Sequence, residues 1–148
     1  MQSNYSSNLN NESLKHGHHN CKQPEYYYEA VQINVNTSDY YMFSTESTLN
    51  TFGYLYEYPF DLYNSLDLSL SENDDSCETT QFQITAYLHF NITYVLIVTT
   101  PYDYMNEQGP FSVIVKGQDG VAMKPIGMHT HMFLLTSIEY FLLFKIVI

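Results

Sequence analysis

Apolar and polar residues alternate in short stretches from Tyr26 onwards, and each stretch predicts a β-strand. Successive side chains of a strand point to opposite faces of its sheet, so a period of two indicates one buried and one solvated face. The clearest example is VQINVN, residues 31–36. The stretches expected as strands read EAVQINVN, YYMFST, FGYLYEY, LDLSL, QFQITAYLH, ITYVLIVTT and FSVIVKG.

Regularly spaced short strands with polar turns predict an all-β protein. We expect an antiparallel β-sandwich, jelly-roll-like, with about seven to eight strands. A βαβ sheet would need amphipathic helices between its strands, and no 3.6-residue period is found there. The stretch ITYVLIVTT, residues 92–100, is apolar on both faces and is predicted to be a central strand covered on both sides.

The same patterns divide the chain into three parts. Residues 1–24 are polar and almost free of aromatic residues, which predicts a disordered tail. Residues 25–117 form the expected β-sandwich domain. Residues 118–148 are expected to be a linker followed by a hydrophobic C-terminal segment.

That C-terminal segment, residues 132–148, reads MFLLTSIEYFLLFKIVI. Two charged residues and a length that barely crosses a bilayer make a membrane-spanning helix unfavourable. Three alternatives remain: a buried or membrane-associated end of the fold, a GPI-type anchoring signal, or translated sequence that does not belong to the domain. Membrane association is expected only through this segment.

The charge balance excludes some classes of partner. The chain has five lysines, no arginine and sixteen acidic residues, which give a net charge of −11. Nucleic-acid binding requires cations that displace counterions from phosphates, so no nucleic-acid partner is expected. The negative potential favours Ca²⁺ or a basic partner over an anionic membrane surface.

Glycosylation triplets and cysteines favour an extracellular or cell-surface location. The triplet N-x-S/T occurs at Asn4, Asn11, Asn36 and Asn91. Asn36 and Asn91 are the expected glycosylation sites, because each falls at a strand end or turn. Cys21 and Cys77 are expected to form a disulfide in an oxidising compartment. No signal peptide begins the chain, so we expect a piece of a larger secreted or surface protein.

Two stretches have the composition of metal sites. HGHHNC holds His16, His18, His19 and Cys21, although no second group with zinc-like spacing follows, which favours a His-rich polar tail. The acidic turn SENDDS, with Asp67 upstream, predicts a calcium site. Its expected ligands are Asp67, Asn73, Asp74 and Asp75. A solvated acidic hairpin turn is the simpler alternative for this stretch.

The fifteen tyrosines are the remaining candidates for a binding surface. Tyr54, Tyr56 and Tyr58 share one strand face, and aromatic faces stack on sugars or anchor protein partners. Tyr41 and Tyr94 fall among apolar alternants and are expected in the core. Most of the other tyrosines are expected to pack as scaffold, because tyrosine favours half-buried strand positions.

Catalysis is not expected. The chain lacks a nucleophile elbow, a zinc-protease helix motif and a phosphate-binding glycine loop. His89 is the single histidine within the predicted sandwich, and a hydrolase would need it beside an acid in a pocket. A hydrolase is therefore the least favoured of the functions considered.

The order of motifs resembles the bacterial pre-peptidase C-terminal domain and similar extracellular modules of animal multidomain proteins. The resemblance covers about residues 26–117 and rests on DYYMF, NTFGYLYEY, SENDDS, ITYVLIVTT and GPFSVIV. The family's leading Asp is replaced here by Asn50 or Thr51, and its last strand tyrosine by Phe111.

The resemblance implies a non-catalytic accessory module for adhesion, targeting or spacing, and calcium or a matrix polymer as ligands of some members. The alternative function is a carbohydrate-binding module that uses surface tyrosines. The identity of the protein or glycan partner stays open at this point.

Overall fold

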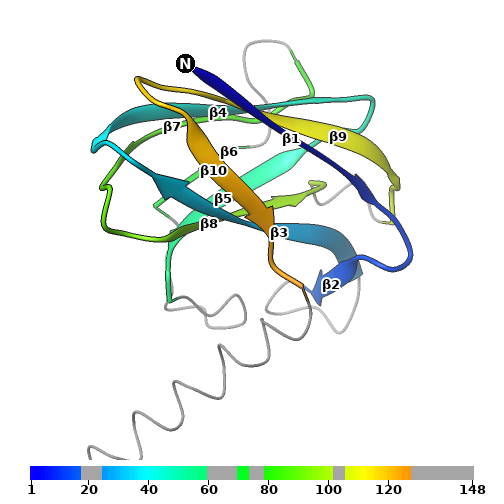
Figure 1. The fold of residues 1–148 in the computed structure, drawn as a ribbon. Coiled ribbons are helices and arrows are strands. Elements are labelled where there is room, and N and C mark those ends of the chain that lie inside the picture. Colours follow the sequence, from blue (N-terminus) through cyan, green and yellow to red (C-terminus); the bar gives the residue numbers. More distant parts are fainter. Residues whose placement is uncertain (18–24, 60–69, 74–78, 102–105, 128–148) are drawn as a thin grey trace, which may run out of the picture.

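A computed structural model describes residues 1–17, 25–59, 70–73, 79–101 and 106–127. These residues form β-strands and turns without a helix, and the strands build two sheets that face each other (Figure 1). The strands are β1 (Gln2–Leu9), β2 (Leu14–Gly17), β3 (Glu25–Val35), β4 (Asp39–Ser47), β5 (Phe52–Glu57), β6 (Ser71–Asn73), β7 (Gln83–Leu88), β8 (Tyr94–Thr99), β9 (Gly109–Lys116) and β10 (Val121–Pro125).

The strand order confirms the predicted antiparallel β-sandwich of the jelly-roll type. One sheet has the order β1-β9-β4-β7, and the other has the order β10-β3-β8-β5-β6, with β2 also paired to β3. All of these pairings are antiparallel. The described residues contain ten strands, which exceeds the seven to eight that the sequence predicts.

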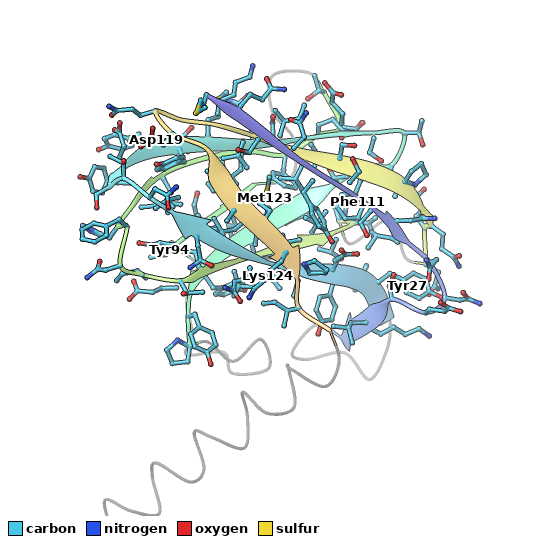
Figure 2. All side chains as sticks on the ribbon, viewed as in Figure 1. Tyr27, Tyr94, Phe111, Asp119, Met123 and Lys124 are labelled. Carbon is cyan, nitrogen blue, oxygen red and sulfur yellow. The ribbon has the colours of Figure 1, made fainter. Side chains whose placement is uncertain are left out.

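The core lies between the two sheets and is built from alternate residues of their inner faces (Figure 2). Tyr41 and Tyr94 are both buried there, as the sequence predicts. Strand β8 is buried at every position, so the prediction of a central strand covered on both faces is confirmed. The largest fully buried side chains include Tyr41, Tyr94, Phe43, Phe82, Leu9, Ile33, Leu55, Ile84, Leu88 and Leu96.

The prediction of a disordered N-terminal tail is wrong for residues 1–17. Strand β1 pairs with β9 over its whole length, and β2 pairs with the start of β3. The inner face of β1 is mostly polar, so the sequence shows no alternation of apolar and polar residues that would predict a strand there. Leu9 at the end of β1 is nevertheless fully buried. Residues 18–24 lie outside the described part of the chain.

The predicted end of the sandwich at residue 117 is also wrong. Strand β10 pairs with β3 from Val121↔Val35 to Pro125↔Val31, so residues expected in a linker extend the six-stranded sheet. The hydrophobic C-terminal stretch lies outside the described residues. Most of LDLSL, which is expected to form a strand, also lies outside the described residues. The described residues of SENDDS, Ser71–Asn73, form strand β6, although a turn is expected there.

Hydrogen bonds join β1 to the opposite sheet along one edge of the sandwich. The hydroxyls of Tyr5 and Ser7 both donate to the carboxylate of Glu29 on β3, the latter at 2.6 Å. The Ser3 hydroxyl oxygen accepts the backbone N–H of Val121 on β10 at 2.8 Å. The inward polar side chains of β1 are therefore paired, which removes the penalty of burying them.

From the raised pKa of the Tyr5 hydroxyl we expect the folded protein to lose stability at alkaline pH. Burial raises the pKa of Tyr5 well above its ordinary value of 10.0, and the Glu29 carboxylate raises this pKa further. The unfolded chain therefore releases the proton at a lower pH than the folded protein. The contribution of Tyr5 to stability is present below pH 10 and declines above it.

We expect the free energy of unfolding to fall less steeply above pH 10 in Tyr5→Phe than in the wild type. Urea unfolding at several pH values above 9 measures this slope. Ser7→Ala is the control, because it removes the other hydroxyl bonded to Glu29 without removing a titrating proton. Equal slopes in Tyr5→Phe and the wild type would contradict the assignment.

The backbone of Gly53 on β5 packs directly against the ring of a core residue. A Cβ atom placed there would lie 2.8 to 2.9 Å from three ring atoms of the fully buried Phe82. Gly53→Ala is therefore expected to lower the free energy of unfolding by about 1–3 kcal/mol, as overpacking does. Chemical denaturation measures the change. Gly120→Ala is the control, because its Cβ would meet only Ser3 Oγ at 3.8 Å, and an equal loss in both variants would refute the packing argument.

Candidate functional site

Four aromatic side chains gather at one end of the four-stranded sheet, and we call Tyr40, Tyr87, His89 and Phe90 the aromatic patch. Tyr40 on β4 and Tyr87 on β7 stand directly opposite each other in the strand register. Their neighbours Tyr41 and Leu88 point into the core, so the two tyrosines point outward. The exposed fractions are 66% for Tyr40, 46% for Tyr87 and 64% for Phe90.

Three rings of the patch, those of Tyr40, Tyr87 and His89, are in edge-to-face contact. The ring centroids of Tyr40 and Tyr87 are 5.2 Å apart with an interplanar angle of 78°. The rings of Tyr87 and His89 are also 5.2 Å apart, at 73°. Edge-to-face pairs at this distance are favourable, so the patch keeps its shape while it leaves aromatic surface open to solvent.

Hydrogen bonds fix the turn that carries His89 and Phe90. The backbone N–H of Phe90 donates to the Ser38 hydroxyl at 3.0 Å, and the N–H of His89 donates to the Tyr94 hydroxyl at 2.9 Å. The N–H of Ile92 donates to the carbonyl of His89 at 3.1 Å, which closes a β-turn. The turn between β7 and β8 is therefore tied to the turn before β4 and to the core.

Amide and hydroxyl side chains, interspersed with Met42, Ile114 and Lys116, continue from the patch along the outer face of the same sheet. The next two rows in the register are Gln2, Lys116, Met42 and Thr85, followed by Asn4, Ile114, Ser44 and Gln83. Lys116 is the single charge in these two rows. A ligand on this face would meet aromatic rings at one end and, beyond them, a mixture of amides, hydroxyls, two apolar side chains and Lys116.

The predicted tyrosine stripe Tyr54, Tyr56 and Tyr58 lies on the six-stranded sheet instead. Tyr54 and Tyr56 do share a face, and their rings stack at 6.3 Å and 26°, with Phe52 stacked on Tyr54 at 4.5 Å. Tyr56 is only 8% exposed, because it packs into a second cluster with Tyr28, Ala30, Val95, Ile97 and Ile126. Tyr58 follows the end of β5 and is 37% exposed. This stripe therefore packs largely as scaffold.

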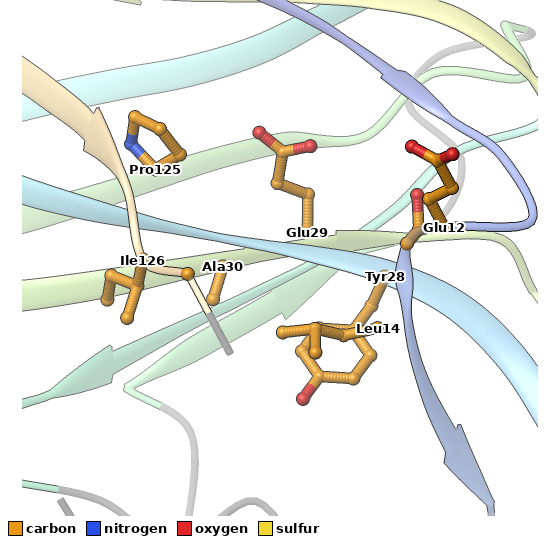
Figure 3. A pocket seen from close by; sticks show the side chains of 9 residues that line it. Glu12, Leu14, Tyr28, Glu29, Ala30, Pro125 and Ile126 are labelled. Atoms are coloured by element: carbon orange, nitrogen blue, oxygen red, sulfur yellow. The ribbon is translucent and has the colours of Figure 1, made fainter. Parts of the chain in front are cut away.

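A pocket of about 280 Å³ lies in the notch between β2 and β10 along β3 (Figure 3). Leu14, Tyr28 and Ile126 form its apolar part, and Glu12 and Glu29 line it as well. Figure 3 shows the Glu29 side chain leaving β3 on the side opposite Tyr28. Because Glu29 already accepts two hydroxyl donors, its position is explained by the contact between the sheets.

The calcium and disulfide predictions fall mainly outside the described residues. Asp67, Asp74, Asp75, Cys21 and Cys77 all lie there, and Asn73 ends β6. Among the described residues, no three His, Cys, Asp or Glu side chains come together as metal ligands. Within the described segments, the buried oxygen Asn50 Oδ1 has no hydrogen-bond partner, and it is of the hard type that Ca²⁺ accepts. Calcium binding and the disulfide stay predictions.

The other predicted site residues are placed at the surface. Asn36 and Asn91 are both exposed in turns, as accessible glycosylation sites need to be. His89 is exposed beside Tyr87, and in the described part of the chain it belongs to no group of three or more His, Cys, Asp and Glu side chains that could hold a metal ion. His18, His19 and Cys21 lie outside the described residues, and only the backbone of His16 is described, within β2.

Sequence reasoning missed Tyr40, Tyr87 and Phe90, although a signal for two of them was present. In QFQITAYLH the alternation places Tyr87 on the same face as the glutamines. In DYYMF it places Tyr40 on the face of the strand that points away from Tyr41 and Phe43. An aromatic residue among polar alternants predicts an exposed ring. The pairing of the two strands, which joins the rings, cannot be read from these local patterns.

No family model and no curated protein match the chain. Among solved structures, the chain is similar to the crystal structure of the Yersinia pseudotuberculosis-derived mitogen YPM. The TM-score is 0.45 at 10% sequence identity, over 85% of this chain and 98% of that chain. Within the described residues, no helix has the length and apolar character to cross a membrane.

Alanine substitutions distinguish the buried stripe from the exposed patch. Tyr56→Ala is expected to lower the free energy of unfolding by about 3–5 kcal/mol, because it removes a buried aromatic ring. Apart from the lost ring contact with Tyr87, Tyr40→Ala is expected to change the free energy of unfolding by about 0.5 kcal/mol or less, because the Tyr40 side chain is exposed. Urea unfolding of both variants measures the difference. Similar losses in the two variants would show that one of the rings is misassigned.

Proposed function

We propose that this chain is a non-catalytic accessory module of a secreted or surface protein, and that it binds saccharides for adhesion or targeting. The aromatic patch and the adjoining outer face of the four-stranded sheet would form the binding surface. The proposal follows both the motif resemblance and the exposed sites for glycosylation at Asn36 and Asn91.

The single observation that carries the proposal is the exposure of the patch. Tyr40 and Tyr87 are in contact on the surface and the exposed Phe90 lies on the turn that follows Tyr87, while the neighbouring strand residues fill a continuous core. Exposed apolar area of this kind is a feature of ligand and partner sites. Its position beside amide and hydroxyl side chains matches a sugar, which offers C–H faces for stacking and hydroxyls for hydrogen bonding.

Charge narrows the class of saccharide. The net charge of −11 opposes polyanions such as sulfated or phosphorylated glycans through long-range repulsion. Lys116, in the row next to the patch, is the one cation on this part of the face. Neutral saccharides are therefore the ligands that the surface favours.

A glycan array and titration calorimetry would test the proposal. We expect binding to neutral glycans, and a loss of affinity of about tenfold or more in Tyr40→Ala and Tyr87→Ala, as for truncation of an aromatic anchor. Tyr58→Ala is the matched control, because it removes an exposed tyrosine from the other sheet. The proposal fails if no glycan binds, or if all three variants bind as the wild type does.

A further inference from the structure

Phe90 and Asn91 occupy the two central positions of the turn between β7 and β8. The hydrogen bond from the N–H of Ile92 to the carbonyl of His89 closes this turn at 3.1 Å. Consecutive Cα atoms are about 3.8 Å apart, so the side chains of Phe90 and Asn91 start from neighbouring points of the same turn. Asn91 is exposed, and the Phe90 side chain is 64% exposed.

The triplets at Asn36 and Asn91 meet at this end of the sandwich. Ser38, the last residue of the triplet at Asn36, accepts the Phe90 N–H at 3.0 Å. Thr93, the last residue of the triplet at Asn91, accepts the side-chain N–H of Asn34 at 3.0 Å. These bonds hold the turn in place, so Phe90 and Asn91 keep a fixed relation to each other.

Phe90 differs from the two tyrosines of the patch in its surroundings. Tyr40 and Tyr87 contact each other and lie on the sheet face, whereas Phe90 makes no aromatic ring contact within the described residues. An exposed phenylalanine in a turn gains nothing from water, and it lacks the hydroxyl with which tyrosine is solvated. A group attached close to the turn could therefore cover this ring and remove apolar surface from water.

We infer that Asn91 carries an N-linked glycan whose first sugar packs against the ring of Phe90. The inference rests on the secreted location in the proposed function, and it assigns Phe90 to the protein's own glycan while Tyr40 and Tyr87 remain for an external ligand. The sugar ring offers a face of C–H groups to the aromatic face. The attachment removes the entropic cost of bringing the two together.

A double-mutant cycle in a secretory eukaryotic host tests this contact. The proteins are the wild type, Phe90→Ala, Asn91→Gln and the double variant, and the readout is the equilibrium constant of unfolding in denaturant. We expect Asn91→Gln to lower the folding equilibrium constant about two- to tenfold, the size of a contact between aromatic rings. In the Phe90→Ala background, Asn91→Gln should have almost no effect, because the ring is already absent.

A second glycosylation triplet provides the matched control. Asn11 is exposed in the turn between β1 and β2 and follows Asn10, with no aromatic neighbour in the chain on either side. Any effect of Asn11→Gln is expected to be the same with and without Phe90. Trimming the glycans to the first sugar with an endoglycosidase should preserve the coupling between Phe90 and Asn91.

Two results would overturn the inference. Peptide mass mapping that found Asn91 unmodified would show that no sugar is attached there. Additive effects of the two substitutions would show that the sugar and the Phe90 ring are not in contact. Neither result bears on the proposed saccharide binding, because binding through Tyr40 and Tyr87 is measured separately on the glycan array. Conversely, a glycan array without signal would not change the interpretation of the double-mutant cycle.

Discussion

The burial of strand β8 on both faces is the constraint on which the rest of the structure depends. Its alternate residues enter two different clusters, the main core through Tyr94, Leu96 and Val98, and the second cluster through Val95 and Ile97. A shift of one residue in its pairing with β3 and β5 would exchange the two sets, so its register is strongly fixed. Tyr94 also accepts the His89 N–H, and β8 thereby holds the turn of the aromatic patch.

The opposite side of the sandwich depends on polar contacts. In the jelly-roll order, the first strand of the chain closes a sheet beside the late strand β9, and this pairing cannot form until most of the chain has been placed. Its inward residues Ser3, Tyr5 and Ser7 offer little apolar area. Their hydrogen bonds to Val121 and Glu29 supply the specificity that apolar packing provides elsewhere.

This difference explains which elements could be predicted from the sequence. Strands with three inward apolar residues, such as the one through Val31, Ile33 and Val35, are marked by local alternation alone. Local alternation does not mark strand β1, because its half-buried Ser3 and Ser7 bond to partners more than twenty residues away. The same limit applies to the tyrosines: alternation placed Tyr54 and Tyr56 on one face correctly, but which sheet faces are covered is a property of the whole fold.

The exposed aromatic patch is a cost that the fold alone does not require. Tyr40 and Tyr87 would pair as well in the sheet if they were threonines, and β7 is an edge strand of its sheet, where exposed apolar side chains favour association between molecules. Groups that cover the rings would remove this hazard. A saccharide on the tyrosines and a glycan beside Phe90 act through the same contact, a sugar face on an aromatic face. The external ligand and the attached sugar are thus two uses of one physical property of this end of the sandwich.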